Sequence, residues 1–330
     1  MELDLEKWQQ NIMTNKQKAV CILSAPRSGS SALASLVADM GLHLGAENTL
    51  KEGDDFNPKG YYELKQVLDI NEQILMESID STIWEIGESL GWSKAKTVKI
   101  IEYYTWTVAR NPVRAEDVSG KTREEVENFI RSITQEQQTL LLKDARMCAT
   151  LPVWEEYIDP VCIVLWRHPA EVQRSLGKMT GIPQKIALQL WYAYNRLAFI
   201  VSEKYPRICL SYQELIENPR EVQKKLGDLF RNEGISISLL DDSRESSIEA
   251  SLFRNRNRGG VDLTSKQTEL YGALAEKDYE KIANIEEEDS DRALLPLIGM
   301  VNHFNGELSR RPGRRYLNAI ADIYHSIFGR

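Results

Sequence analysis

A turn rich in serine and glycine follows the first strongly apolar run of the chain. The run covers 19–23, and the turn at 26–31 reads Pro-Arg-Ser-Gly-Ser-Ser. A strand, such a turn and then a helix direct free backbone N–H groups at an anion. Serine hydroxyls add donors, glycine allows close approach, and an arginine fork suits phosphate or sulfate oxygens. The candidate anion-binding residues are Arg27, Ser28, Gly29, Ser30 and Ser31.

This turn differs from the phosphate loop of nucleoside triphosphatases. The pattern GxxxxGK[ST] is absent from the sequence, and so is its Lys-Ser/Thr pair that holds Mg²⁺ and a γ-phosphate. We therefore predict that the turn cradles an anionic group without hydrolysing a nucleoside triphosphate. The alternative is a serine-rich turn that only caps its own helix.

A second cation follows the apolar run at 161–166. Arg167 comes directly after that run, and Ser175 lies eight residues further on, in a predicted helix. Ligands of open α/β sheets bind beyond the carboxyl ends of the strands, which is where we expect Arg167. The alternative is an ion pair between Arg167 and Glu171. Taken together, the two segments predict a ligand with two separate anionic groups, such as a nucleotide phosphorylated at its 3′ and 5′ positions.

Apolar runs alternate with helical patterns over most of the chain. The runs at 19–23, 139–142, 161–166 and 207–212 are typical of parallel strands buried on both faces. We predict helices after the first run and at 63–79, 122–137, 183–204 and 219–230. The helix at 122–137 is expected to start from a capping box at Thr122. This alternation predicts a three-layer α/β fold, a parallel sheet flanked by helices. We expect one domain over 1–264, with its core at 18–260, and a helical C-terminal extension over 265–330 packed on it.

Composition narrows the classes of function. The 330 residues include 41 Lys and Arg against 49 Asp and Glu, a net charge of −8, which argues against nonspecific nucleic-acid binding. The longest apolar runs fall far short of the ~20 residues that span a bilayer, and the first residues are acidic, unlike a signal peptide. No cluster has metal-ligand spacing, and the cysteines predict reduced thiols in a cytoplasmic protein. These are Cys21, Cys148, Cys162 and Cys209.

The paired motifs resemble the sulfotransferases that use 3′-phosphoadenosine 5′-phosphosulfate (PAPS), over roughly residues 18–260. The resemblance implies a P-loop-NTPase-like sulfotransferase fold in which the turn at 26–31 holds the 5′-phosphosulfate. It also implies that Arg167 and Ser175 hold the 3′-phosphate, and that Tyr212, in a segment similar to the family's YEDL, lies near the adenine. The segment 253–260 is loosely similar to the family's basic loop on the 3′-phosphate, which makes Arg256 and Gly259 cofactor-binding candidates.

One departure from the family leaves the general base open. Many eukaryotic cytosolic members have Lys at the position of Arg27, and a Lys-Thr-His-Leu-Pro segment whose His is the base. The corresponding segment here, 143–146, reads Lys-Asp-Ala-Arg. Glu63, which ends the segment Asn-Pro-Lys-Gly-Tyr-Tyr-Glu at 57–63, is the first candidate for the base; the alternative is a solvated glutamate at a helix start. Asp144, which could instead pair with Arg146, is the second candidate and His43 the third. Lys143 is a secondary candidate near the sulfate.

The predicted reaction is in-line transfer of the sulfuryl group of PAPS to an acceptor hydroxyl or amine, without a metal, leaving adenosine 3′,5′-bisphosphate. Arg27 and the N–H groups of the turn would stabilise charge on the leaving phosphate. The departure favours a small-molecule, carbohydrate, peptide or natural-product acceptor. The alternatives are a nucleotide-dependent kinase with a degenerate phosphate loop, and a non-catalytic nucleotide-binding protein.

Two further segments have open roles. The aromatic residues within 84–106 fit either an acceptor wall or ordinary core. The apolar helical pattern at 316–328 fits packing on the main domain, on a second copy in a homodimer, or on a membrane surface.

Overall fold

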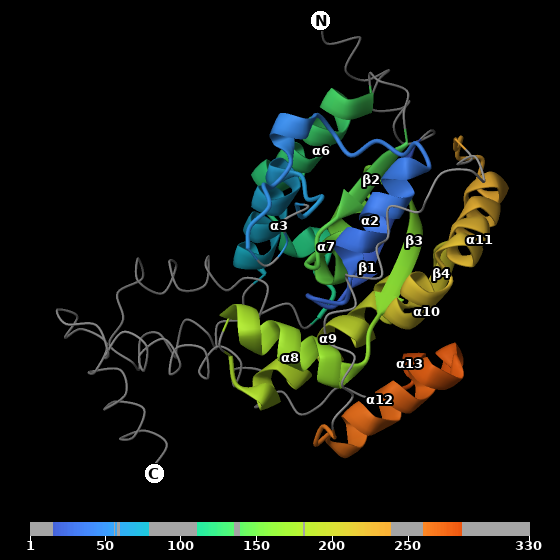
Figure 1. Cartoon of the computed structure of the whole chain (residues 1–330). Helices are drawn as coiled ribbons and strands as arrows, with labels where there is room; N and C mark the ends of the chain where they lie inside the picture. Colours follow the sequence, from blue (N-terminus) through green and yellow to red (C-terminus); the bar gives the residue numbers. More distant parts are fainter. Residues whose placement is uncertain are drawn as a thin grey trace, which may run out of the picture.

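A parallel sheet forms the centre of the computed structural model (Figure 1). The structure describes residues 16–55, 57, 60–78, 111–134, 139–180, 182–238 and 260–285. Within these residues the sheet has four strands in the order β2-β1-β3-β4, all parallel. The strands are β1 (Gln17–Ser24), β2 (Leu140–Lys143), β3 (Ile158–Trp166) and β4 (Arg207–Ser211).

Helices cover both faces of the sheet, because alternate strand residues point to opposite sides and nearly all are apolar. Ala19, Cys21 and Leu23 of β1 belong to one core cluster, and Val20 and Ile22 belong to another. The first cluster is closed by α3 (Lys65–Glu77), α6 (Gly120–Thr134), α7 (Met147–Trp154), α8 (Pro169–Thr180) and α9 (Gln184–Ser202). The second is closed by α2 (Ser30–Asp39), α10 (Tyr212–Glu217) and α11 (Pro219–Asn232). The predicted three-layer α/β class is confirmed.

The strand order determines where a ligand can sit. The chain leaves β1 for β2 on one side and returns to β3 on the other side of β1. The register pairs Ser24 with Leu165, so β1 and β3 end at nearly the same level. Such a reversal of strand order opens a crevice beyond the strand ends, where ligands of α/β sheets bind. The two segments with predicted anion sites follow these two strands.

The start of α6 differs from the prediction. The helix begins at Gly120, so Thr122 lies inside it and the predicted capping box is wrong. The hydroxyl of Ser119 accepts a hydrogen bond from the Thr122 N–H at 3.3 Å, while the Thr122 hydroxyl donates to Glu77 Oε1 at 2.7 Å. A tertiary partner on α3 has therefore taken the hydroxyl that the sequence pattern assigned to the cap.

Two short helices of the C-terminal extension, α12 (Ser265–Glu276) and α13 (Tyr279–Ala283), lie beside α9 (Figure 1). Leu270, Ala273, Leu274 and Ile282 are buried in the same core cluster as α9. The boundary at 264 remains a prediction, since these helices share their core with the rest of the chain.

Thiols and membrane spans were also predicted from composition. All four cysteines are free thiols, and Cys209 alone among them is partly exposed. Among the described helices, none combines the length and the apolar character that crossing a bilayer requires.

Candidate active site

The turn between β1 and α2 has an unusual backbone. Arg27 and Gly29 both have positive φ, 67° and 96°. Gly29 is the N-cap of α2, and no described side chain caps this helix. The predicted alternative, in which the serines cap their own helix, is therefore not what the structure shows. Ser28 is fully buried, and its Oγ has no hydrogen-bond partner in the described part of the chain.

Tyr212 closes the turn from the side of β4. A Cβ added to Gly29 would lie 2.2 Å from Cδ2 of Tyr212, so only glycine fits there. The Arg167 guanidinium lies over the same ring, with its Cζ 4.1 Å from the centroid. The Tyr212 ring thus contacts both the turn and the second predicted anion site.

The two anion motifs meet at the crevice. Arg27 Nε donates to Ser175 Oγ at 3.0 Å, and Arg167 Nη1 donates to the Arg27 carbonyl at 3.3 Å. Arg167 also pairs with Glu171, Nε to Oε2, at 2.8 Å. The ion pair with Glu171, which was the predicted alternative for Arg167, is therefore present together with the contact to the turn. Residues about 140 positions apart in sequence form one cluster of two guanidinium groups and a hydroxyl.

Glu63 lies beside the same turn in a pair with Lys143. Lys143 Nζ is 2.7 Å from Glu63 Oε1 and also donates to the Tyr61 carbonyl at 2.8 Å and to Ser31 Oγ at 3.3 Å. Lys143 is only 5% exposed. Lys51 Nζ lies 3.6 Å from the other carboxylate oxygen of Glu63. Glu63 is therefore a carboxylate held between two ammonium groups, one of which contacts a serine of the turn.

The segment that carries Glu63 is folded back onto the turn. Asn57 Nδ2 donates to Ser31 Oγ at 3.1 Å and to the Gly60 carbonyl at 2.5 Å. Tyr62 has a φ of 56°, and its hydroxyl donates to Ser35 Oγ of α2 at 3.3 Å. These bonds bring the end of the 57–63 segment against the start of α2, which places Glu63 at the strand ends.

Tyr61 supports this segment from outside. Its hydroxyl donates to Asp54 Oδ2 at 2.7 Å, and Lys51 Nζ lies 4.4 Å from its ring centroid. Burial and the hydrogen bond to Asp54 raise the pKa of Tyr61. The phenol therefore stays protonated at neutral pH and acts as a donor.

Asp144 has a different environment. Its Oδ2 lies 2.9 Å from Arg146 Nε and accepts a second bond from Asn71 Nδ2, also at 2.9 Å. Asn71 Oδ1 in turn accepts from the Thr150 hydroxyl at 2.6 Å and from Trp154 Nε1 at 2.8 Å. The predicted alternative, pairing with Arg146, is what the structure shows. This buried network joins α3, β2 and α7, and it favours a structural role for Asp144.

The two histidines within the described residues, His43 and His168, make backbone-level contacts at the ends of elements. His43 makes a backbone bridge to Leu140 at the start of β2, whereas Lys143 ends that strand. This geometry counts against His43 as the base. His168 Nδ1 accepts from the Ala170 N–H at 3.2 Å, at the start of α8.

Several predicted residues cannot be placed. Arg256 and Gly259, the aromatic residues within 84–106 and the segment 316–328 lie outside the described residues. Among the residues that are described, no group of three or more His, Cys, Asp or Glu is suited to hold a metal ion.

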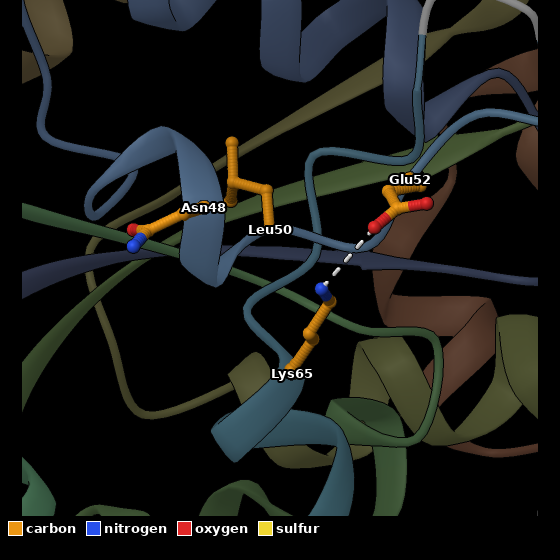
Figure 2. A pocket seen from close by; sticks show the side chains of 4 residues that line it. All are labelled: Asn48, Leu50, Glu52 and Lys65. Atoms are coloured by element: carbon orange, nitrogen blue, oxygen red, sulfur yellow. Dashed lines mark ion pairs between the residues drawn. The ribbon is translucent and has the colours of Figure 1, made fainter.

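A pocket of about 450 Å³ lies next to the segment with Lys51 (Figure 2). Its lining residues are Asn48, Leu50, Glu52 and Lys65, and Glu52 and Lys65 point toward each other with Oε1 and Nζ 3.7 Å apart. Both charged side chains are largely exposed, so this ion pair contributes little to stability. Lys65 therefore offers a control position for the removal of a cation from the candidate site.

Lys51 and Asn57 were not assigned roles from the sequence. Asn57 stands in the segment that was singled out for Glu63, but nothing in its type or spacing indicates a bond to the turn. Lys51 had no sequence signal, because its partner lies 12 positions away across an irregular pairing in which the Lys51 N–H donates to the Glu63 carbonyl.

Comparison with known proteins gives only structural matches. The sequence matches no family model and no curated protein. The sulfotransferase domain of the curacin biosynthetic pathway is similar at a TM-score of 0.45 and 16% identity, covering 78% of this chain and 98% of that domain. The sulfotransferase domain of the Synechococcus PCC 7002 olefin synthase gives 0.41 and 19%, covering 88% and 95%. Sulfotransferase STF1 of Mycobacterium tuberculosis H37Rv gives 0.36 and 11%, covering 72% of each chain.

The three structures named above are sulfotransferases. Because the TM-scores are below 0.5 and the identities are 19% or less, these likenesses carry no argument about the chemistry of this chain.

Proposed function

We propose that the protein is a sulfotransferase that uses PAPS as its donor. The observation that carries the proposal is the meeting of Arg27, Ser175 and Arg167 beyond the carboxyl ends of β1 and β3. A ligand with two anionic groups on one adenosine suits such a cluster, because each motif presents a guanidinium at the end of its own strand.

In this proposal the 5′-phosphosulfate lies in the turn at 26–31 and the 3′-phosphate lies at Arg167 and Ser175. The orphaned Oγ of Ser28 and the uncapped start of α2 support the first assignment, since both lack a partner in the described part of the chain. The hydrogen bond between Arg27 and Ser175 would be exchanged for bonds to the nucleotide. The proposal extends to Arg256 and Gly259 at the 3′-phosphate and to Tyr212 near the adenine.

We assign Glu63 as the general base. The acceptor oxygen or nitrogen would attack sulfur as the bond from sulfur to the bridging oxygen breaks, and the acceptor proton would pass to Glu63. Arg27 would stabilise the negative charge on the departing bridging oxygen. Lys143 contacts both Glu63 and Ser31. In this proposal its ammonium group would bind the sulfuryl oxygens as well as the Glu63 carboxylate.

The acceptor class is also a proposal. A hydroxyl or amine of a small molecule, carbohydrate or natural product would receive the sulfuryl group in the cytoplasm. A homodimer is part of the same proposal. No observation favours the kinase or the non-catalytic alternative, and the following experiments separate them.

The first experiment measures thermal unfolding with adenosine 3′,5′-bisphosphate in the presence of EDTA. We expect the melting temperature to rise, because only the folded state binds the nucleotide. Arg167→Ala should weaken binding by about 10- to 100-fold, the effect of losing about 1.5–3 kcal/mol from a charged hydrogen bond. Lys65→Ala is the matched control and should bind like the wild type. Stabilisation by Mg-ATP alone would support a kinase instead.

The second experiment follows radiolabelled sulfate from PAPS to acceptor or, in the absence of one, to water. Glu63→Gln should reduce transfer at least 100-fold, the lower range of general-base contributions, while the bisphosphate affinity stays within about twofold. Asp144→Asn provides a comparison at the other carboxylate. Transfer near the wild-type rate in Glu63→Gln would reject Glu63 as the base.

A further inference from the structure

One aromatic side chain of the C-terminal extension reaches the second anion motif. The Tyr271 ring of α12 lies edge-on to three other rings. Its centroid is 4.9 Å from that of His168, 6.2 Å from Trp166 and 6.5 Å from Trp191. Trp166 and His168 are the two chain neighbours of Arg167, so Tyr271 packs against the side chains that precede and follow Arg167 in the chain.

The third contact acts on Arg167 itself. Trp191 of α9 is fully buried, and its Nε1 donates to the Arg167 carbonyl at 2.8 Å. The Arg167 side chain is held separately, by Glu171, by the Arg27 carbonyl and by the Tyr212 ring. The backbone and the guanidinium of Arg167 therefore have different supports, and Tyr271 belongs to the backbone support.

His168 connects the same contact to Ser175. Its Nδ1 accepts from the Ala170 N–H at the first turn of α8, the helix that carries Ser175. A shift of the His168 ring would therefore move the start of α8 as well as Arg167. Glu63, Lys143 and Ser31 lie on the other side of β1, toward β2, and have no contact with Tyr271 among the described residues.

We propose that Tyr271 is a positioning residue for the 3′-phosphate end of the nucleotide. This inference rests on the proposed function. Tyr271 holds the Trp166–His168 segment, so that the Arg167 fork and the Ser175 hydroxyl keep the separation that a phosphate requires. Bonds from a charged fork depend steeply on geometry, and displacements of about 1 Å are costly. The C-terminal extension would thus tune one end of the nucleotide site and leave the other unchanged.

The test compares two nucleotides by calorimetry. Adenosine 3′,5′-bisphosphate and adenosine 5′-monophosphate differ only in the 3′-phosphate, so the ratio of their dissociation constants measures that group alone. In Tyr271→Ala we expect this preference to fall about tenfold or more, while the monophosphate affinity stays within about twofold. Tyr271→Phe keeps the ring and should keep the preference. If the alanine variant does not fold, Tyr271→Leu should show the same selective loss.

A matched control lies on the neighbouring helix. Tyr279 of α13 packs against Phe199 with centroids 5.5 Å apart, so Tyr279→Ala removes a similar ring from the same extension. It should leave the preference unchanged. Equal weakening of both nucleotides in Tyr271→Ala, or a preference that survives the substitution, would overturn the role of Tyr271. A wild-type protein without any preference for the bisphosphate would overturn the proposed function, and this inference with it.

Discussion

At the residue scale, the turn after β1 contains conformations that most residues avoid. Arg27 has a left-handed backbone although it is not glycine. Such a conformation costs of order 1 kcal/mol, and outliers of this kind collect at ligand sites. The orphaned Ser28 hydroxyl is a second cost in the same turn. Both features lower the stability of the free protein, and both support the proposal that the turn binds a ligand.

Gly29→Ala tests this turn. The new Cβ would lie 2.2 Å from the Tyr212 ring, and the alanine would also have to adopt a φ of 96°. We expect a loss of about 2–4 kcal/mol in unfolding free energy and a loss of bisphosphate binding, measured by urea denaturation and calorimetry.

Gly234→Ala is the control for backbone strain without a clash. Gly234 has a φ of 69° but nothing within 4 Å of the added Cβ. It should lose only about 1 kcal/mol and bind normally. If the two variants behaved alike, the Tyr212 contact would not be what requires glycine at 29.

Residue types were sufficient to predict that Arg27 and Arg167 each follow the end of a strand and face one ligand with two anionic groups. Both follow apolar runs, and parallel strands end at one edge of a sheet. The pair of Glu63 and Lys143 could not be predicted in the same way. It requires β2 to lie beside β1, with Lys143 opposite Ile22, and the 57–63 segment to fold back over Ser31.

At the element scale, buried polar side chains decide how helices meet the sheet. Asn71 is fully buried on α3 and bonds to Asp144 after β2 and to Thr150 and Trp154 of α7. The sequence predicted a helix at 63–79, but an asparagine within it carries no signal of its partners. The error at α6 has the same origin, because Thr122 found a partner on α3.

Asn71→Ala should remove all three bonds and leave the buried Trp154 Nε1 without its acceptor, although Asp144 keeps Arg146 and Thr150 keeps the Arg146 carbonyl. We expect the unfolding free energy to fall by about 2–4 kcal/mol in urea denaturation. Asn284→Ala, which removes an exposed asparagine bond to the Glu280 carbonyl, should change it by less than about 0.5 kcal/mol. Bisphosphate binding should survive in both. A loss below about 1 kcal/mol for Asn71→Ala would show that the network is not structural.

Glu214 couples α10 to the C-terminal extension. Burial alone would raise its pKa, but the bonds from Lys277 and Ser211 outweigh burial and lower the pKa. A lowered carboxyl pKa stabilises the fold above the unfolded value of about 4.3, and this stability is lost as the pH falls through the folded value.

We therefore expect Glu214→Gln to be less stable than the wild type at pH 7 and to lose less stability on acidification to pH 3. Urea denaturation as a function of pH measures the unfolding free energy of both proteins. Glu276→Gln, at an exposed position of α12, is the control for removing one carboxylate. Parallel pH curves for the wild type and Glu214→Gln would contradict the assignment.

At the scale of the whole molecule, the reactivity of the thiols measures how well the packed core excludes solvent. Burial raises the pKa of Cys162 to about 12 and of Cys209 to about 11. At pH 8 about one Cys209 side chain in a thousand is then a thiolate, the form that reacts with disulfide reagents. The three buried thiols should react at the rate of unfolding and the partly exposed Cys209 before them, as measured by colorimetric titration with and without urea. Rapid reaction of all four in the native protein would show an open core.

Fold class was readable at this scale from the alternation of strands and helices alone. The strand order was not, because apolar runs at 19–23, 139–142 and 161–166 are equivalent as patterns. Their order depends on how side chains from distant segments pack, and the crevice of the site depends on that order.

The position of β1 in the sheet has a consequence for synthesis on the ribosome. Its partner β3 lies 141 residues later in the chain, as between Lys18 and Asp159. At 5–20 residues per second, the apolar β1 segment waits roughly 7–28 s before its neighbour has been made. A nascent chain stalled before residue 158 would hold β1 with its β3-facing edge unpaired, and should depend on chaperones more than a chain released after β4.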